Sequence, residues 1–199
     1  PQEALSKEAF LQCSYYGLYP TATLHEVVKK FRKKLFFPAY ADAKLILDIG
    51  KPETGEAQDL FFRRLWESFQ MDHGGPFLSS RHIMVLLRRR QDYQKLRAAP
   101  LDFEVIYQLS ASGFAGEGAK QQLERQLAFC REKDISTVAL SPANWDAETA
   151  ALCKEAGLKV MVRSCKKADD IFRAVSLQAD LIESTFLSPA YMNRMKFLK

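Results

Sequence analysis

Six short apolar runs recur along this chain, and a segment with helical spacing or a basic stretch separates each run from the next. Runs this rich in Val, Ile and Leu on consecutive positions are typical of parallel strands that helices cover on both faces. Parallel strands also need a crossover connection, usually a helix, so the alternation predicts an α/β fold with a parallel sheet and right-handed crossovers. We expect strands close to 45–49, 83–87, 103–109, 136–141, 159–163 and 180–184.

Local signals support the intervening helices. Thr23 and Glu26 form a capping-box pattern at the start of the first helix, and Gly157 is placed to end a later one. Apolar residues at helical spacing mark the buried side of the first helix and of the two that follow the first and third strands. They are Leu24, Val27, Val28 and Phe31; Phe62, Leu65, Trp66 and Phe69; and Ala119, Leu123, Leu127 and Cys130. The helix before the last strand carries Ala168, Ile171, Phe172 and Val175.

Each run ends in a polar residue. The six are Asp48, Arg88, Gln108, Ser141, Arg163 and Glu183. In a (β/α) barrel these positions meet at the carboxyl-terminal mouth, where such enzymes keep their chemistry, whereas in an open doubly wound sheet they spread along an edge. A simpler explanation, without a functional role, is that a polar residue begins each loop. As a set, two acids and two arginines could hold a metal and a phosphate. No GxGxxG follows any run, so a dinucleotide-binding sheet has no support.

Composition sets further bounds. With 199 residues, 47% of them hydrophobic, the chain can bury one core, and we expect a single domain over 1–199. The chain begins at Pro1 rather than Met, so it also suits a fragment of a longer protein. It has no apolar run long enough to span a membrane and no signal-peptide pattern, which predicts a cytoplasmic protein or one at the cytoplasmic face of a membrane.

The cysteines and the basic stretches give weaker signals. Cys13, Cys130, Cys153 and Cys165 share no CxxC spacing, and three scattered histidines cannot complete a local zinc motif, so we expect buried free thiols. Basic residues crowd into 29–34 and 88–97. Either stretch could meet an anionic lipid, polymer or nucleic acid, or could be a solvated helix face. Aromatic residues are poorly interleaved for base stacking, which argues against nucleic acid.

Two segments resemble a known family. "YPTATLHEVVKKF…AKLILDIG" is similar to the part of glycerophosphodiester phosphodiesterases and phosphatidylinositol-phospholipase-like proteins in which a threonine-led helix precedes a strand ending in an acid. "ALCKEAGLKVMVRSCKKADDIFRAVSLQADLIESTFLSP" looks like the close of the same barrel. The resemblance covers 19–189 and implies a partial TIM-type (β/α) barrel with about six parallel strands, which would be the third to the eighth, so that the first two βα units are lacking.

The resemblance also implies a chemistry that this chain matches only in part. In the family, histidines after the first strands act as general acid and base, and acids bind a divalent metal such as Mg or Ca. Only Asp48 matches cleanly, as the candidate metal-binding acid. His25 falls inside an expected helix, His73 in a loop and His82 at the start of a strand, so the catalytic residues are unknown. The family's usual lysine is replaced by Gly50, and its terminal "TD" by 183–185, "EST".

Two functional readings follow. The first is a degenerate glycerophosphodiester-phosphodiesterase-like domain, linked to lipid metabolism by its relatives, that serves ligand binding or assembly without hydrolysis. The alternative is an active metal-dependent phosphoric diester hydrolase whose catalytic histidines lie on a missing segment or a partner. A more distant possibility is an unrelated small α/β protein.

In the first reading, phosphate or another anion is the expected ligand. The candidate ligand-binding residues are Arg88, Gln108, Arg163 and Glu183. A partial barrel exposes hydrogen-bonding strand edges, which proteins seldom leave open. We therefore expect the N-terminal segment, another domain or a second copy of the chain, as in an oligomer, to cover them.

Overall fold

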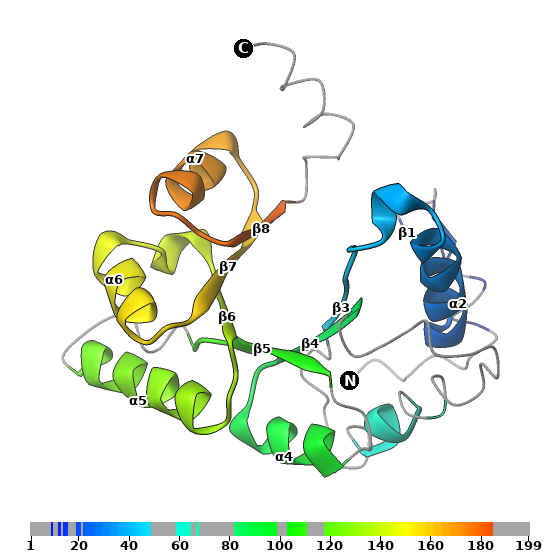
Figure 1. Ribbon diagram of the computed structural model, residues 1–199, viewed down its shortest axis with the longest axis horizontal. Coiled ribbons are helices and arrows are strands. Elements are labelled where there is room, and N and C mark those ends of the chain that lie inside the picture. Colours follow the sequence, from blue (N-terminus) through cyan, green and yellow to red (C-terminus); the bar gives the residue numbers. More distant parts are fainter. Residues whose placement is uncertain are drawn as a thin grey trace. The chain divides into compact units, whose positions relative to one another are not determined.

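The structure is a computed structural model of the chain (Figure 1), and it describes residues 9, 12, 14–15, 19–20, 22–48, 59–64, 67, 82–98, 103–110 and 118–184. The chain divides into two compact units. The first comprises Pro1–Leu47, Pro52–Met84 and Gln94–Phe103, and the second comprises Asp48–Lys51, Val85–Tyr93 and Glu104–Lys199. The prediction of a single domain over the whole chain stays a prediction.

Six strands form one parallel sheet whose spatial order follows the chain order. They are β3 (Leu45–Asp48), β4 (Ile83–Leu87), β5 (Glu104–Gln108), β6 (Thr137–Leu140), β7 (Lys159–Cys165) and β8 (Leu181–Ser184). Sequential order with a crossover between neighbours is the arrangement of a (β/α) barrel wall, whereas an open doubly wound sheet reverses its order. The prediction of a partial TIM-type barrel is therefore confirmed, and each predicted strand lies within two residues of its observed bounds.

Helices cover the outer side of the strands in the second unit, where Figure 1 shows α5 (Ala119–Glu132), α6 (Ala147–Glu155) and α7 (Ala168–Ser176) flanking β5–β8. The inner strands β5 and β6 supply a continuous apolar core because they are buried on both faces. The buried helix and strand residues of this core include Val105, Ile106, Leu123, Leu127, Cys130, Val138, Leu140, Cys153, Val160, Val162 and Ala174.

The residue after α6 has the backbone conformation expected at a helix end, whereas α7 is less buried than its sequence pattern predicts. Gly157 follows α6 with φ of +70°, a left-handed conformation that glycine adopts without strain, as the sequence predicted. On α7, Ala174 is buried, whereas Phe172 and Val175 are 67% and 59% exposed. Ala168 is exposed as well, so three of the four apolar residues noted on this helix in the sequence face away from the core.

The first unit contains α2 (Leu24–Leu35), η1 (Pro38–Tyr40) and the antiparallel pair β1 (Ser14–Tyr15) and β2 (Tyr19–Pro20), a pair that sequence reasoning missed. The capping box at Thr23 and Glu26 is confirmed, since Glu26 N–H donates to Thr23 Oγ1 and Thr23 N–H donates to Glu26 Oε2. In the expected second stripe Phe62 is buried, and the predicted partners 65–66 and 69 lie outside the described residues. The basic helix α4 (Arg90–Ala98) connects β4 to β5.

The strands at the two ends of the order, β3 and β8, each pair with one strand of the described sheet. Their side chains are only partly covered: Ile46 is 36% exposed and Leu181 is 38% exposed. That the N-terminal segment, another domain or a second copy of the chain covers these strand edges stays a prediction. Among the described residues, no helix has both the length and the apolar character needed to cross a membrane.

The described cysteines are free, as expected, whereas Cys13 lies outside the described residues. Cys130, Cys153 and Cys165 are fully buried, and burial raises the pKa of Cys130 to about 12 and that of Cys153 to about 11. Because the thiolate is the reactive form, iodoacetamide at pH 8 is expected to leave both unmodified in the folded chain and to label both in denaturant. Peptide mass mapping measures this, and rapid native labelling of Cys130 would contradict it.

Candidate functional site

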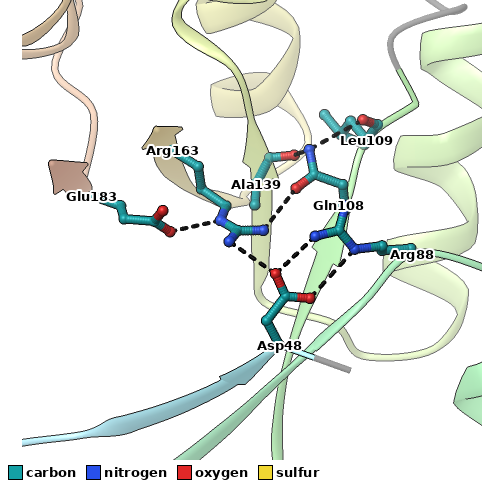
Figure 2. Close-up of polar contacts among 7 residues, drawn as sticks. All are labelled: Asp48, Arg88, Gln108, Leu109, Ala139, Arg163 and Glu183. Atoms are coloured by element: carbon teal, nitrogen blue, oxygen red, sulfur yellow. Dashed lines mark hydrogen bonds and ion pairs between the residues drawn. The ribbon is translucent and has the colours of Figure 1, made fainter. Parts of the chain in front are cut away.

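The polar residues that end the strands come together within the second unit, as Figure 2 shows. We call them the strand-end cluster. Its members are Asp48, Arg88, Gln108, Arg163 and Glu183, with the backbone carbonyl of Ala139. The carboxyl ends of parallel strands meet at one edge, so strand direction alone brings these side chains to a common place. The structure therefore brings the five predicted site residues together, and their role in binding stays a prediction.

Asp48 lies between the two arginines and bonds to both. Arg88 contacts it in a bidentate manner, with Nε 3.3 Å from Oδ1 and Nη2 2.7 Å from Oδ2. Arg163 Nη2 donates to the same Oδ2 at 3.0 Å. Planar guanidinium groups match carboxylates in this geometry, which gives the pairing its specificity. The position between the two guanidinium groups, where the sequence suggested an external anion, thus holds the carboxylate of Asp48.

Arg163 is the most buried charged member, with its side chain 15% exposed, and it makes three different polar contacts. Besides Asp48, its Nε donates to Glu183 Oε2 at 2.7 Å and its Nη1 donates to Gln108 Oε1 at 3.3 Å. Burial on its own would lower the pKa of Arg163, but the hydrogen bond and negative charge of Glu183, followed by those of Asp48, raise it above its usual value. The guanidinium therefore stays charged, and its charge is compensated by two acids.

Gln108 links the charged residues to the backbone of the sheet. Its carbonyl oxygen accepts from Arg163, while its Nε2 donates to Ala139 O at 3.2 Å. This amide orientation is the one that matches both partners, because arginine only donates and a carbonyl only accepts. With Ala139 on β6, the cluster gathers atoms from β3, β5, β6, β7 and β8 and from Arg88, which directly follows β4. One polar network therefore joins the ends of all six strands.

The pairing of β7 with β8 is irregular at Arg163 and Ser164. The β7–β8 register shifts between Val162 and Cys165, and Ser164 lies there with φ of +60°. A non-glycine residue in the left-handed region is uncommon, and bulges often re-aim a side chain at the rim of a barrel. Here the irregular stretch includes Arg163, which contacts residues of three other strands, and the sequence gives no signal of it.

The chemistry of the donor set does not suit a divalent cation. Asp48 and Glu183 are the carboxylates of the cluster, and both already accept from guanidinium groups at 2.7–3.0 Å. The two arginines already neutralise the two acids of the cluster. A Ca²⁺ or Mg²⁺ bound to these carboxylates would lie beside two guanidinium groups, whose positive charge would repel it. Within the ranges that the structure describes, no three His, Cys, Asp or Glu side chains converge to hold a metal ion.

The histidines and Ser141 complete the comparison with the predicted site. His25 lies in α2, and His82 precedes β4, at the strand end opposite to Arg88, where its Nε2 is 3.3 Å from Ala41 O. His73 lies outside the described residues. Ser141 leads into η4 (Pro142–Asn144), and β6 contributes the carbonyl of Ala139 to the cluster instead. A backbone acceptor of this kind leaves no mark on the sequence, so it could not be predicted.

Comparisons with known proteins agree on the fold. Similar solved structures include a Galdieria sulphuraria protein described as a glycerophosphodiester phosphodiesterase, at 18% identity and a TM-score of 0.69, covering 98% of this chain and 70% of that one. A glycerophosphodiester phosphodiesterase from Parabacteroides distasonis is 13% identical with a TM-score of 0.68, covering 98% and 72%. An Oleispira antarctica phosphodiesterase in complex with the product sn-glycerol-3-phosphate is 14% identical with a TM-score of 0.54, covering 80% and 56%.

These likenesses are all at low sequence identity, and they establish the fold. The chain has a glycerophosphodiester-phosphodiesterase-like fold, which confirms the resemblance seen in the sequence at the level of architecture. Neither protein-family models nor curated proteins gave a match.

Proposed function

We propose that this chain is a glycerophosphodiester-phosphodiesterase-like domain that does not hydrolyse diesters, and that its strand-end cluster holds the sheet together instead of binding substrate. The observation that carries the proposal is the state of Asp48, the residue that the resemblance assigns to the metal. Both of its oxygens accept hydrogen bonds from arginine, and one is shared between Arg88 and Arg163. A cation at Oδ2 would compete with both guanidinium groups, and a cation at Oδ1 would compete with Arg88.

The placement of acid and base groups supports the same proposal. Protonation of a leaving group needs a donor within hydrogen-bond reach of it, and such assistance is typically worth about 10²–10⁴-fold in rate. His82, the histidine nearest in sequence to Arg88, is buried at the other end of β4 beside a backbone carbonyl. The hydrogen-bond donors of the cluster are Arg88, Arg163 and the Gln108 amide, and guanidinium and amide groups are not the side chains that enzymes use as general acids.

The test is a hydrolysis assay of the whole chain on glycerophosphocholine with millimolar magnesium or calcium. We expect no turnover above the background of Asp48→Ala, and no shift of the thermal midpoint with either metal, since a bound ligand would stabilise the fold. Addition of sn-glycerol-3-phosphate is expected to leave the midpoint unchanged as well, because the cluster already carries its own carboxylates. The Oleispira antarctica enzyme is the positive control for the assay.

Each result decides between the two functional readings. Metal-dependent turnover that Asp48→Ala abolishes would favour the alternative of an active hydrolase. Stabilisation by sn-glycerol-3-phosphate that Arg88→Met removes, without turnover, would favour a domain that retains anion binding. Either outcome contradicts the proposal as stated.

A further inference from the structure

Three large aromatic side chains protrude where α2 ends, inside the first unit. Phe36 is 66% exposed, Phe37 is 59% exposed and Tyr40 is 48% exposed. We call these three residues the aromatic tip. Single exposed apolar residues are ordinary on protein surfaces, whereas three exposed aromatic side chains within five consecutive positions form an apolar patch of the kind that marks interaction sites.

The helix that leads to the aromatic tip is strongly basic on its outer side. Lys29, Lys30, Lys33 and Lys34 are all exposed, and Val28, on the opposite face, is buried. The helix contains one acid, Glu26, which lies in its first turn and is bonded to Thr23. The helix therefore brings positive charge to the tip and keeps its own acid at its far end, while the exposed Asp42, two residues after Tyr40, is the acid nearest to the tip in the sequence.

Short-range contacts hold the tip in shape. Lys34 Nζ lies 5.5 Å from the centre of the Tyr40 ring, within the range of a cation–π contact. Phe37 N–H donates to Lys34 O at 3.0 Å, and Tyr40 N–H donates to Phe37 O at 2.8 Å. These turns present the aromatic rings and the last-turn lysines from one compact stretch of backbone, so little conformational freedom is lost when they meet a surface.

We propose that the aromatic tip and the four lysines form a docking surface for an anionic phospholipid bilayer. The rings enter the interfacial region, where aromatic side chains are favoured, and the lysines meet the lipid phosphates. A nucleic acid would use the lysines but would leave the exposed ring of Phe37 in water. An apolar protein surface would use the rings but would have to desolvate the lysines. A bilayer satisfies both features together.

The lysines should contribute in order of their distance from the tip. A basic residue near an anionic membrane strengthens binding about fivefold, and the attraction falls off within a Debye length of about 8 Å. A helix rises 1.5 Å per residue, so Lys33 and Lys34 lie about one turn from the tip, and Lys29 lies roughly 10 Å behind Phe36 if the helix stands along the membrane normal. The pair Lys33 and Lys34 is therefore expected to matter more than the pair Lys29 and Lys30.

Co-sedimentation of the full chain with vesicles of phosphatidylcholine and phosphatidylserine, roughly 2:1, tests the proposal. We expect binding that weakens with added salt and is lost on pure phosphatidylcholine. Lys33→Gln/Lys34→Gln should weaken it about 25-fold, two charges at about fivefold each, and Lys29→Gln/Lys30→Gln by less. Phe37→Ser should weaken it about tenfold through lost apolar burial. Phe172→Ser removes an even more exposed phenylalanine from α7 and is expected to have no effect.

A second readout reports insertion directly. In the variant Phe37→Trp, tryptophan emission should shift to shorter wavelength on the anionic vesicles and be quenched by brominated lipid, whereas Phe172→Trp should show neither change. The proposal is overturned if the chain does not bind the vesicles, if Phe172→Ser weakens binding as much as Phe37→Ser, or if an oligonucleotide binds the lysines more tightly than the vesicles do. Circular dichroism checks that every variant keeps the native fold.

Discussion

Replacing Arg163 with methionine is expected to lower the free energy of unfolding by about 2–3 kcal/mol, because the substitution leaves Asp48 and Glu183 partly buried without one of their cations. Breaking a buried ion pair in this way typically costs about 3–5 kcal/mol of stability. The side chains of the two acids are 32% and 35% exposed, so we expect a smaller cost in this cluster. Arg88→Met should cost less, since Arg88 is more exposed and contacts only Asp48 within the cluster. Urea unfolding followed by circular dichroism measures both.

The control is a surface ion pair of the same charge type. Lys120 and Glu148 approach to 3.9 Å with both side chains more than 60% exposed, so Lys120→Met should change stability by no more than about 0.5 kcal/mol. A double-mutant cycle with Arg163→Met and Glu183→Gln isolates the pair itself. If Arg163→Met proves as mild as Lys120→Met, the strand-end cluster does not stabilise the sheet, and the proposed structural role fails.

Truncating Leu140 to alanine is expected to destabilise the second unit by about 3–4 kcal/mol and to lower its thermal midpoint by roughly 10 °C. Leu140 is fully buried in β6, which is covered on both faces, so the lost side chain leaves a cavity that the neighbouring strands cannot fill. Leu181→Ala on β8 makes the same chemical change at a position that is 38% exposed, and should cost less than about 1 kcal/mol. Equal effects at the two positions would contradict the assignment of the core.

The architecture was predictable from the sequence because a strand that is buried on both faces consists almost entirely of apolar residues. Strands such as β4, with five fully covered apolar residues, have no reason to alternate polar and apolar positions, and so they stand out as continuous runs. The pair β1 and β2 was missed for the converse reason: two strands of two residues each carry too little pattern to be recognised.

The members of the strand-end cluster were predictable, whereas their pairing was not. Strand ends converge by topology, so Asp48, Arg88, Gln108, Arg163 and Glu183 could be grouped from their positions alone. Whether an arginine faces a ligand or a neighbouring acid depends on distances of a few ångströms. The register of β7 against β8 and its irregularity at Ser164 set those distances, and neither has a signature in a single sequence.

The contact between Asp48 and Arg163 joins residues 115 positions apart in the chain. Closing so long a loop is entropically costly, so this contact forms only after the intervening strands are assembled. Interactions absent from the folding transition state act on the rate of unfolding and leave the rate of folding nearly unchanged. In a chevron plot of Arg163→Met, we expect a faster unfolding limb and a nearly unchanged folding limb. We therefore expect the strand-end cluster to determine how long the assembled sheet persists rather than how quickly it forms.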